Sequence, residues 1–225
     1  RCVSKGPCPN CNSSDANALY DDGHSYCFSC DTRFDNNSKV IPMTNPKSSG
    51  LKTSGEVSAI DDRSINRETS KAFNVEVIKS GSTITHHIYK YFDKDGNHIA
   101  NKVREVQDKK FWSEGNVGSS LLFGENMFPS GGKYITVCEG EIDAMSVYQM
   151  NGKYPTVSVK NGAASALENC KKSFEYLNKF ETVVLCFDSD DPGRKAAQSV
   201  ARIFEPNKCK VVTLDLKDPN EYMKV

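Results

Sequence analysis

The sequence YITVCEGEIDAMSVYQMNGKYPTVSV at residues 134–159 places a helical pattern between two short apolar runs. The run YITVC at 134–138 is typical of a buried strand, and PTVSV at 155–159 repeats the pattern. Between them, after Gly140, residues 141–150 follow a helical pattern. A helical segment between two such runs predicts parallel strands whose faces are covered by helices.

The same alternation continues to the end of the chain. TVVLCF at 182–187 predicts a third strand, Pro192 marks the start of a helix, and CKVVTL at 209–214 predicts a fourth strand. Before the third strand, apolar residues spaced by four and three predict one face of a helix: Ala163, Leu167, Cys170, Phe174 and Leu177. Residues 133–225 are therefore predicted to form an α/β domain, a parallel sheet flanked by helices.

Three regions of different composition precede this domain. Residues 1–34 contain paired cysteines among turn-forming residues, and residues 35–56 have almost no aromatic or periodic apolar residues, which indicates a flexible linker. Residues 57–132 contain two alternating β-rich runs around Asp95-Gly96, which predict a hairpin in a small β-rich subdomain.

The composition disfavours several classes of protein. The chain has 225 residues, with 29 Lys and Arg against 29 Asp and Glu, as expected of a soluble globular protein. Its sequence has neither the ~20-residue apolar run of a membrane span nor a signal-peptide pattern, so membrane and secreted proteins are disfavoured. Because the formal net charge is zero, binding to nucleic acid must come from local basic patches.

Two CxxC pairs lie near the start of the chain, separated by 15 residues: Cys8, Cys11, Cys27 and Cys30. Each CxxC turn directs two sulfur atoms at one point, so the two turns together supply the four thiolates of a structural Zn²⁺ site. A module of about 34 residues buries too little apolar surface to fold alone, and metal binding can supply the missing stability. Two disulfides are the alternative, which the lack of a secretion signal disfavours.

The segment DDGHSY between the cysteine pairs predicts a hairpin tip that carries Asp22 and His24. Four thiolates already complete a zinc site, so His24 is not needed as a ligand. It could hydrogen-bond a base or a phosphate, and a solvated loop histidine is the alternative.

Carboxylates follow three of the predicted strands at the same end. Glu139 follows the first strand, Asp188 and Asp190 follow the third, and Asp218 follows the fourth in LKDPNE. In open parallel sheets ligands bind beyond the carboxyl ends of the strands, so these side chains share one rim.

Helix capping is the alternative role for acids at such positions. It suits Asp191, just before Pro192, and it suits Glu141 and Asp143 in the first turn of a helix. It does not account for the remaining acids together. Two like charges ~4 Å apart repel by about 4 kcal/mol at an effective dielectric near 20, so these acids need a cation between them.

The predicted ligands of that cation are Glu139, Asp188 and Asp190. Hard oxygen ligands with open coordination positions suit Mg²⁺ or Mn²⁺, with water and substrate phosphates completing the shell. Sites of this kind serve phosphoryl or nucleotidyl transfer.

Basic residues nearby in the sequence could hold the phosphates of a nucleotide. Lys102 and Arg104 lie on the second run of the hairpin, and Lys109 and Lys110 precede an aromatic pair at 111–112. Basic residues interleaved with aromatics suit a surface that tracks phosphates and stacks bases. Lysines on a solvated edge strand are the alternative.

These motifs resemble those of a known family. The E-G-x-x-D run at 139–143, the D-x-D-x-x-G-R-K run at 188–195 and the K-D-x-N-E run at 217–221 resemble the TOPRIM domain of primases. With the four-cysteine module ahead of them, their order is similar to that of the primase half of phage bifunctional primase–helicase proteins. The resemblance is loosest in the linker and in residues 57–85.

The resemblance implies a DNA primase, a nucleotidyltransferase that makes short RNA primers from ribonucleoside triphosphates on single-stranded DNA for replication. By the same resemblance, Glu139, Asp188 and Asp190 match the metal-binding acids of the family, and Asp218 matches a further active-site acid. The implied cofactors are one structural Zn²⁺ and catalytic Mg²⁺ or Mn²⁺.

Further roles are implied for basic residues and for the zinc module. Lys102 and Lys109 match the catalytic lysines of the family, although Lys110 is in an equally good register. Asp22 and His24 match positions of the zinc module that read the template, where the family recognises a short DNA trinucleotide. The family's zinc module also helps to deliver primers to DNA polymerase.

The resemblance also implies partners and a location. No G-x-x-x-x-G-K-[ST] loop occurs in this sequence, so the helicase of the family is expected either beyond Val225 or as a separate protein. The expected location is the cytoplasm of the phage's host, away from any membrane. A noncatalytic zinc and TOPRIM DNA-binding protein of recombination is the alternative. Such proteins usually carry a helix-hairpin-helix segment before the zinc site, whereas seven residues precede Cys8 here.

Overall fold

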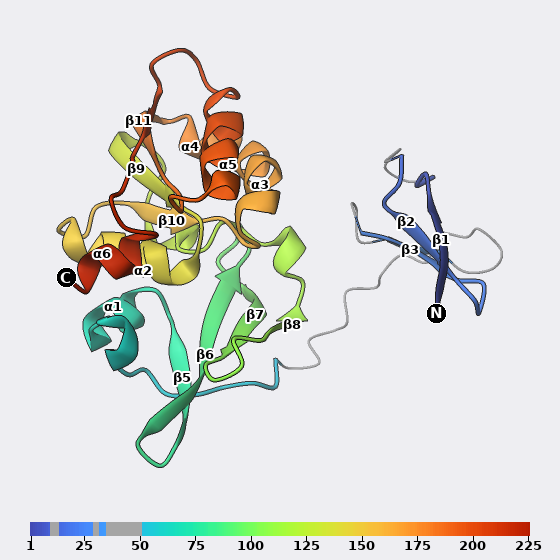
Figure 1. Ribbon diagram of the computed structural model, residues 1–225, viewed down its shortest axis with the longest axis horizontal. Helices are drawn as coiled ribbons and strands as arrows, with labels where there is room; N and C mark the ends of the chain where they lie inside the picture. Colours follow the sequence, from blue (N-terminus) through green and yellow to red (C-terminus); the bar gives the residue numbers. More distant parts are fainter. Residues whose placement is uncertain (10–13, 29–31, 35–50) are drawn as a thin grey trace. The chain divides into compact units, whose positions relative to one another are not determined.

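The computed structural model describes residues 1–9, 14–28, 32–34 and 51–225. The chain divides into two compact units, Arg1–Gly50 and Leu51–Val225 (Figure 1). Each unit contains its own sheets and its own buried core. The two units are therefore described one at a time.

The first unit is built on a four-stranded antiparallel sheet with the order β1-β2-β3-β4. Its strands are β1 (Cys2–Gly6), β2 (Asn17–Tyr20), β3 (Ser25–Cys27) and β4 (Thr32–Phe34). Residues 21–24 form the turn between β2 and β3, with Gly23 at a φ of 84°. A backbone with positive φ favours glycine, because glycine has no Cβ to clash with the chain. The hairpin predicted around Asp22 and His24 is thus present.

The second unit begins with a four-stranded antiparallel sheet in the order β5-β6-β7-β8. Its strands are β5 (Glu76–Ser80), β6 (Thr83–Phe92), β7 (His98–Glu105) and β8 (Phe111–Gly115). The predicted hairpin is formed by β6 and β7, which pair from His86↔Glu105 to Phe92↔His98 around the turn that contains Gly96.

Residues 51–56, which we expected at the end of the linker, instead lie against this sheet. The backbone N–H and the hydroxyl of Thr53 both donate to Glu114, at 3.0 and 2.6 Å, and Glu56 forms an antiparallel bridge with Val77. These polar contacts to strand residues fix the segment. The expected linker of residues 35–56 therefore ends before residue 51. Its remaining part, 35–50, lies outside the described residues.

The second sheet of this unit is parallel, with the order β10-β9-β11-β12. Its strands are β9 (Gly132–Cys138), β10 (Thr156–Ser158), β11 (Phe180–Cys186) and β12 (Cys209–Val211). Cys138 and Cys186, the last residues of β9 and β11, are register partners. The two central strands therefore end at the same level, and the acids that follow them leave the sheet at one edge.

Helices join the parallel strands and cover both faces of the sheet. They are α2 (Glu141–Met150), α3 (Ala166–Lys172), α4 (Phe174–Leu177), α5 (Asp191–Ala201) and α6 (Pro219–Met223). Cys170, Leu177 and Val200 bring α3, α4 and α5 into the core on one face. On the other face, Met145 of α2 shares a core with Tyr89 of the antiparallel sheet (Figure 1). The predicted α/β class, with a β-rich subdomain ahead of a parallel sheet, is confirmed.

Short helical segments complete the unit. They are η1 (Asp61–Arg63), α1 (Arg67–Ala72), η2 (Val117–Ser119), η3 (Glu125–Met127) and η4 (Ala163–Ser165). The single helix expected across residues 163–177 is divided into η4, α3 and α4, with a break at Ser173. The Ser173 hydroxyl donates to the buried Glu125 at 2.8 Å, a contact that the apolar spacing could not reveal. None of the helices in the described residues has the length and apolar character that crossing a bilayer requires.

Phe123 connects the two sheets of the second unit. Its backbone N–H and C=O exchange hydrogen bonds of 3.1 Å with Ser158 of β10. Its ring is 1 % exposed and lies 5.3 Å from the ring of Phe73, with Tyr89 and Tyr91 of β6 at 5.8 and 5.7 Å. This aromatic cluster fixes the antiparallel sheet against the parallel one.

Phe123→Ala should therefore destabilise the second unit by about 3–5 kcal/mol, because it leaves a cavity among aromatic rings. Urea unfolding followed by tryptophan fluorescence measures the change. Tyr154→Ala, at a ring position that is 60 % exposed, is the control and should cost less than about 0.5 kcal/mol. A loss below about 1 kcal/mol in the Phe123 variant would show that this ring does not hold the sheets together.

Candidate active site

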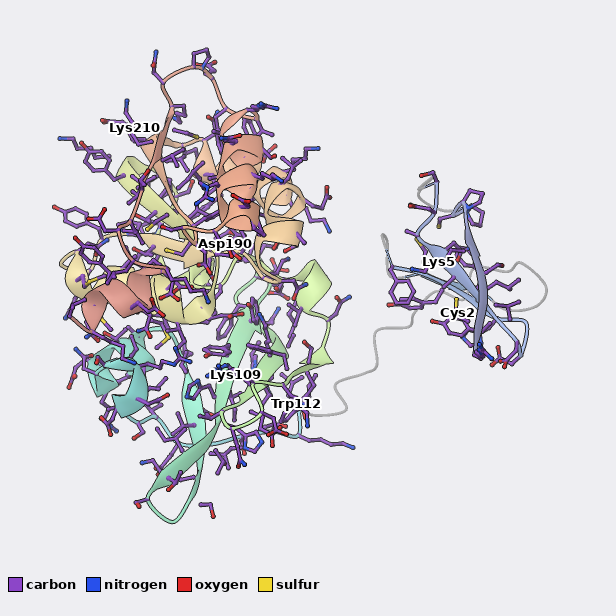
Figure 2. All side chains as sticks on the ribbon, viewed as in Figure 1. Cys2, Lys5, Lys109, Trp112, Asp190 and Lys210 are labelled. Carbon is purple, nitrogen blue, oxygen red and sulfur yellow. The ribbon has the colours of Figure 1, made fainter. Side chains whose placement is uncertain are left out.

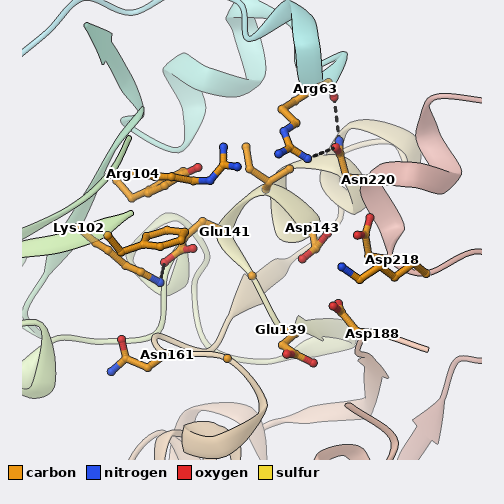
Figure 3. Close-up of a pocket in the computed structure, with 16 residues that line it drawn as sticks. Arg63, Lys102, Arg104, Glu139, Glu141, Asp143, Asn161, Asp188, Asp218 and Asn220 are labelled. Atoms are coloured by element: carbon orange, nitrogen blue, oxygen red, sulfur yellow. Dashed lines mark hydrogen bonds and ion pairs between the residues drawn. The ribbon is translucent and has the colours of Figure 1, made fainter. Parts of the chain in front are cut away.

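A pocket of about 610 Å³ opens where the parallel strands end, and residues from both sheets of the second unit line it (Figure 3). One side is acidic, with Glu139, Asp143, Asp188 and Asp218. The other side is basic, with Arg63, Lys102 and Arg104. Such a pocket is suited to a ligand that carries both phosphates and a metal ion.

Glu139 and Asp188 each place a buried oxygen in this pocket without a partner. Glu139 Oε1 accepts from the Ala163 N–H at 3.2 Å. Glu139 Oε2 and Asp188 Oδ1, in contrast, are buried and accept no hydrogen bond from any described residue. Leaving a buried carboxylate oxygen without a partner is costly, so a missing partner is expected at this point.

The surroundings of the two acids disfavour their charged forms. Burial, together with the carboxylates of Glu139 and Asp218, raises the pKa of Asp188 to about 6. Burial also raises the pKa of Glu139, with a smaller contribution from Asp190 in the same direction. A cation between the acids would remove this repulsion.

Asp143 is an acid of the site that the sequence analysis assigned only to helix capping. Burial raises its pKa well above the usual value, and the charges of Asp218 and Asp188 add to the effect. Asp143 lies in the first turn of α2, four residues after Glu139, and it lines the pocket. The E-G-x-x-D spacing at 139–143 could have indicated that Asp143 belongs to the site, because a tight strand-to-helix turn brings the two acids of this motif to the same edge of the sheet.

Asp190 and Asp218 both cap helices. Asp190 Oδ1 accepts from the Gly193 N–H at 2.8 Å and starts α5, and Asp218 Oδ1 accepts from the Glu221 N–H at 2.8 Å and starts α6. The cap of α5 is therefore Asp190, whereas the sequence analysis assigned this role to Asp191. Asp218 lines the pocket, and Asp190 is exposed and lies outside its lining.

The donor set can be compared with what a divalent ion requires. Within the described ranges, no three Asp, Glu, His or Cys side chains form a ready-made cluster of metal ligands. Mg²⁺ needs no such cage, because it is commonly held by one or two carboxylates with water and phosphates completing its shell. The unpartnered oxygens of Glu139 and Asp188 are hard ligands of this kind. These residues fit Mg²⁺ or Mn²⁺.

Lys102 is held at the basic side of the pocket by a buried network. Its Nζ donates to Glu141 Oε1 and to the Lys160 carbonyl, both at 2.7 Å. The Tyr91 hydroxyl donates to the same Glu141 oxygen at 2.6 Å. Glu141, expected only as a first-turn acid, thus fixes the position of the predicted catalytic lysine.

Arg104 and Arg63 add two further guanidinium groups to this side. Arg104 is 8 % exposed, and its Nη1 is buried and donates to no described residue. Arg63 Nη1 donates to Asn220 of α6 at 3.4 Å, and Asn220 Nδ2 donates back to the Arg63 carbonyl at 2.8 Å (Figure 3). A buried cation without a counter-charge favours an anionic ligand. Arg63 lies far from every motif in the sequence, so no local signal marked it.

Lys109 lies outside this pocket. It belongs to the turn between β7 and β8, where its φ is 55°, and Lys110 beside it is paired with Asp108 at 2.7 Å. Figure 2 shows Lys109 beside the antiparallel sheet and Asp190 at the parallel sheet, well separated. Of the two predicted catalytic lysines, the structure therefore brings only Lys102 to the acids, and it leaves the choice between Lys109 and Lys110 open.

The hairpin tip of the first unit holds His24 between two neighbours. The His24 ring stacks on Tyr20 with centroids 4.5 Å apart and planes at 9°. His24 Nδ1 lies 2.5 Å from Asp22 Oδ1. Partial desolvation acts to raise the pKa of Asp22, but the hydrogen bonds from His24 outweigh it and lower this pKa. The pair is thus fixed in orientation, and no residue in the described part of the first unit hydrogen-bonds to Nε2 of the ring.

The predicted zinc ligands can be followed only in part. Cys8 and Cys27, one from each CxxC pair, are buried together with Phe34 in the small core of the first unit. Cys11 and Cys30 lie outside the described residues. The described part of this core supplies little apolar burial, as expected of a small module that relies on bound metal. The four-thiolate site stays a prediction.

Asp188→Asn should stabilise the protein when divalent ions are removed. Because the folded-state pKa of Asp188 lies above 3.8, the stability that this group contributes is present below about pH 4 and lost as the pH rises through about 6. At about pH 7.5 in EDTA, the variant should therefore gain on the order of 2 kcal/mol over the wild type, and the gain should shrink toward pH 4. Thermal unfolding across this pH range measures the gain.

Mg²⁺ should stabilise the wild type and not the Asp188 variant, since a ligand that binds only the folded state raises its stability. Asp191→Asn, a neighbouring exposed acid paired with Arg194, is the control and should respond to Mg²⁺ as the wild type does. An Asp188 variant that is less stable than the wild type at about pH 7.5 in EDTA would show that the Asp188 carboxylate is not repelled by the neighbouring acids.

Comparisons with known proteins agree with this geometry. A Toprim-like family model matches residues 136–223. The DNA helicase/primase of Enterobacteria phage T3 is 36 % identical over 229 residues, a match that covers 96 % of this chain and 40 % of that relative. The chain thus spans less than half the length of that curated relative.

Two solved structures also match nearly the whole chain. The crystal structure of the primase fragment of the bacteriophage T7 primase-helicase protein has a TM-score of 0.70 and 33 % identity, and the match covers 98 % of this chain and 94 % of that one. The primase domains in a structure with bacteriophage T7 lagging-strand DNA polymerase and an RNA/DNA hybrid have a TM-score of 0.64 and 32 % identity, with 98 % and 91 % coverage. This chain therefore belongs to the family of primases found in phage primase–helicase proteins.

Proposed function

We propose that this chain is the RNA-polymerising part of a primase and joins ribonucleotides into short primers on single-stranded DNA for replication. In the reaction, the 3′-hydroxyl of one ribonucleotide attacks the α-phosphorus of the next, the bond to the β-phosphate breaks, and pyrophosphate leaves. The observation that supports this best is one pocket whose lining combines carboxylate oxygens of Glu139 and Asp188 with Arg104, all of which leave a buried polar atom without a partner among the described residues. The resemblance to the phage primases gives the reaction class.

Glu139 and Asp188 are the residues that would hold Mg²⁺ or Mn²⁺, with Asp143 and Asp218 beside them and Asp190 at the start of α5. When bound, such an ion lowers the pKa of the attacking hydroxyl and neutralises charge on the phosphate. The carboxylates themselves must be deprotonated to bind it. Because the pKa of Asp188 is raised to about 6 in the metal-free site, protons compete with the metal at low pH, so activity at limiting Mg²⁺ should fall as the pH drops toward that value.

The basic side of the pocket serves the triphosphate. Lys102, held by Glu141 and the Lys160 carbonyl, directs its ammonium group to one fixed position. Arg104 and Arg63 supply guanidinium groups, whose planar donors suit phosphate oxygens. Because these groups are already ordered, little side-chain entropy is lost when the nucleotide binds. Lys109, by resemblance the second lysine, would meet the phosphates from outside the pocket.

The first unit would read the template. Asp22 fixes the His24 ring through Nδ1, and Tyr20 supports the ring from one face. The remaining Nε2 can then hydrogen-bond a base edge in a defined direction. A structural Zn²⁺ on Cys8, Cys11, Cys27 and Cys30 would hold this hairpin in shape.

The partners follow from the relatives. The phage T3 relative is a helicase/primase, so a helicase in the same polypeptide or as a separate protein is part of this proposal. One T7 structure shows primase domains interacting with DNA polymerase and bound to an RNA/DNA hybrid, which supports primer delivery to a polymerase. The host cytoplasm is the proposed location, as for a phage replication enzyme.

The direct test supplies the protein with ribonucleoside triphosphates, Mg²⁺ and mixed-sequence single-stranded DNA, and detects labelled RNA on a gel. The wild type should form short RNA. Glu139→Gln and Asp188→Asn should each reduce it at least about 100-fold, because each removes a charged ligand. Asp191→Asn, an exposed acid beside the site, should retain activity. DNA binding without RNA synthesis would instead support the noncatalytic recombination alternative.

His24→Ala should lower primer initiation on the template while sparing the extension of a supplied primer, since the hairpin acts on template choice. The two rates are measured separately with the same DNA. Asp21→Asn, in the same turn, is the control. Equal losses in initiation and extension would show that His24 does not read the template.

A further inference from the structure

Phe111 is an exposed aromatic residue that lines the active-site pocket. Its side chain is 52 % exposed, although it lies at the start of β8 in the sheet that forms the basic side. β8 is the outermost strand of that sheet, so nothing pairs with it on its outer side in the described part of the unit. A large apolar ring left open beside a charged pocket is a feature that a ligand can cover.

The register of the strands places two cations beside this ring. Phe111 is the register partner of Arg104, and Lys102 lies two residues earlier on the same face of β7. Lys102 Nζ is 5.0 Å from the centroid of the Phe111 ring, and Arg104 Cζ is 6.0 Å from it. Both cations belong to the basic side of the pocket. An aromatic surface and phosphate-binding cations are therefore contiguous.

This juxtaposition corresponds to the two chemically different ends of a nucleotide. A nucleobase stacks on an aromatic ring, and its phosphates pair with cations a few ångströms away. Stacking is also tolerant of base identity, because every base has a π-face. An enzyme that copies a template must accept different nucleotides at one position, which is what a stacking contact permits.

We propose that Phe111 is the stacking platform for the base of a ribonucleoside triphosphate bound in this pocket, with Lys102 and Arg104 holding its phosphates. This inference rests on the proposed function, and it adds a base-binding residue to it. The nucleotide is preferred over a template base, because Phe111 shares its pocket with the acids suited to metal and with the phosphate-binding cations.

Trp112 provides a matched control on the same strand. It is 40 % exposed, pairs with Val103 and lies edge-on to His86 at 5.4 Å, so it faces the other side of the sheet. It is not among the pocket-lining residues. A general effect of removing an exposed aromatic from β8 should appear in both variants, whereas loss of stacking should appear only at Phe111.

The experiment compares Phe111→Leu, Phe111→Trp and Trp112→Leu with the wild type. Loss of one stacking contact should raise the KM for ribonucleoside triphosphates about 5- to 100-fold in Phe111→Leu, with kcat changed less than about threefold. Phe111→Trp should restore most of the affinity, and Trp112→Leu should match the wild type. Inhibition by inorganic tripolyphosphate, which has no base, should be unchanged in Phe111→Leu.

Other outcomes would overturn the proposal. Equal weakening of tripolyphosphate and nucleotide would mean that Phe111 only positions the cations. An unchanged KM with weakened binding to single-stranded DNA would assign the ring to the template. Equilibrium binding of a fluorescent ribonucleoside triphosphate, measured without template, tests the stacking contact even if the wild type makes no RNA. A wild type that makes no RNA would overturn the proposed function and not the stacking contact.

Discussion

Repulsion between carboxylates at the ends of β9 and β11 is the constraint on which the rest of the site depends. The register of Cys138 with Cys186 brings Glu139 and Asp188 out of the sheet at one level. Burial leaves Glu139 Oε2 and Asp188 Oδ1 without a described partner. A fold that holds such groups in place stores unfavourable electrostatic energy at this edge when the acids are charged, and either protonation or a bound cation relieves it. The arrangement is costly for stability, and it fits the proposed metal site.

The opposite charge comes from a different sheet. Lys102 and Arg104 lie on β7, so the acidic and basic sides face each other only because the antiparallel sheet is fixed against the parallel one. Phe123 provides that fixation through its bridge to Ser158 and its packing on aromatic rings. Packing in the interior therefore determines the electrostatics of the pocket.

The sequence predicted those parts of the fold that repeat locally. Alternating apolar and helical patterns located the strands and helices of the parallel sheet, and the strand ends located Glu139 and Asp188. Long-range contacts were not predictable: Arg63 reaches the pocket through Asn220, 157 residues away. A capping acid and a ligand acid look alike in a sequence, so Asp190 and Asp143 could be assigned only from hydrogen bonds and burial. Lys109 lies in the turn between β7 and β8 and outside the pocket lining, which its sequence position beside Lys110 did not reveal.

We propose that the acidic edge is a divalent-cation site whose occupancy competes with protons. The most direct test is to titrate Mn²⁺ into the metal-free full chain and to measure the bound ion by electron paramagnetic resonance. We expect saturable Mn²⁺ binding at about pH 7.5 that weakens at least tenfold by about pH 5 and is lost in the double variant Glu139→Gln, Asp188→Asn. Binding that persists unchanged in the double variant would show that Glu139 and Asp188 do not hold the ion.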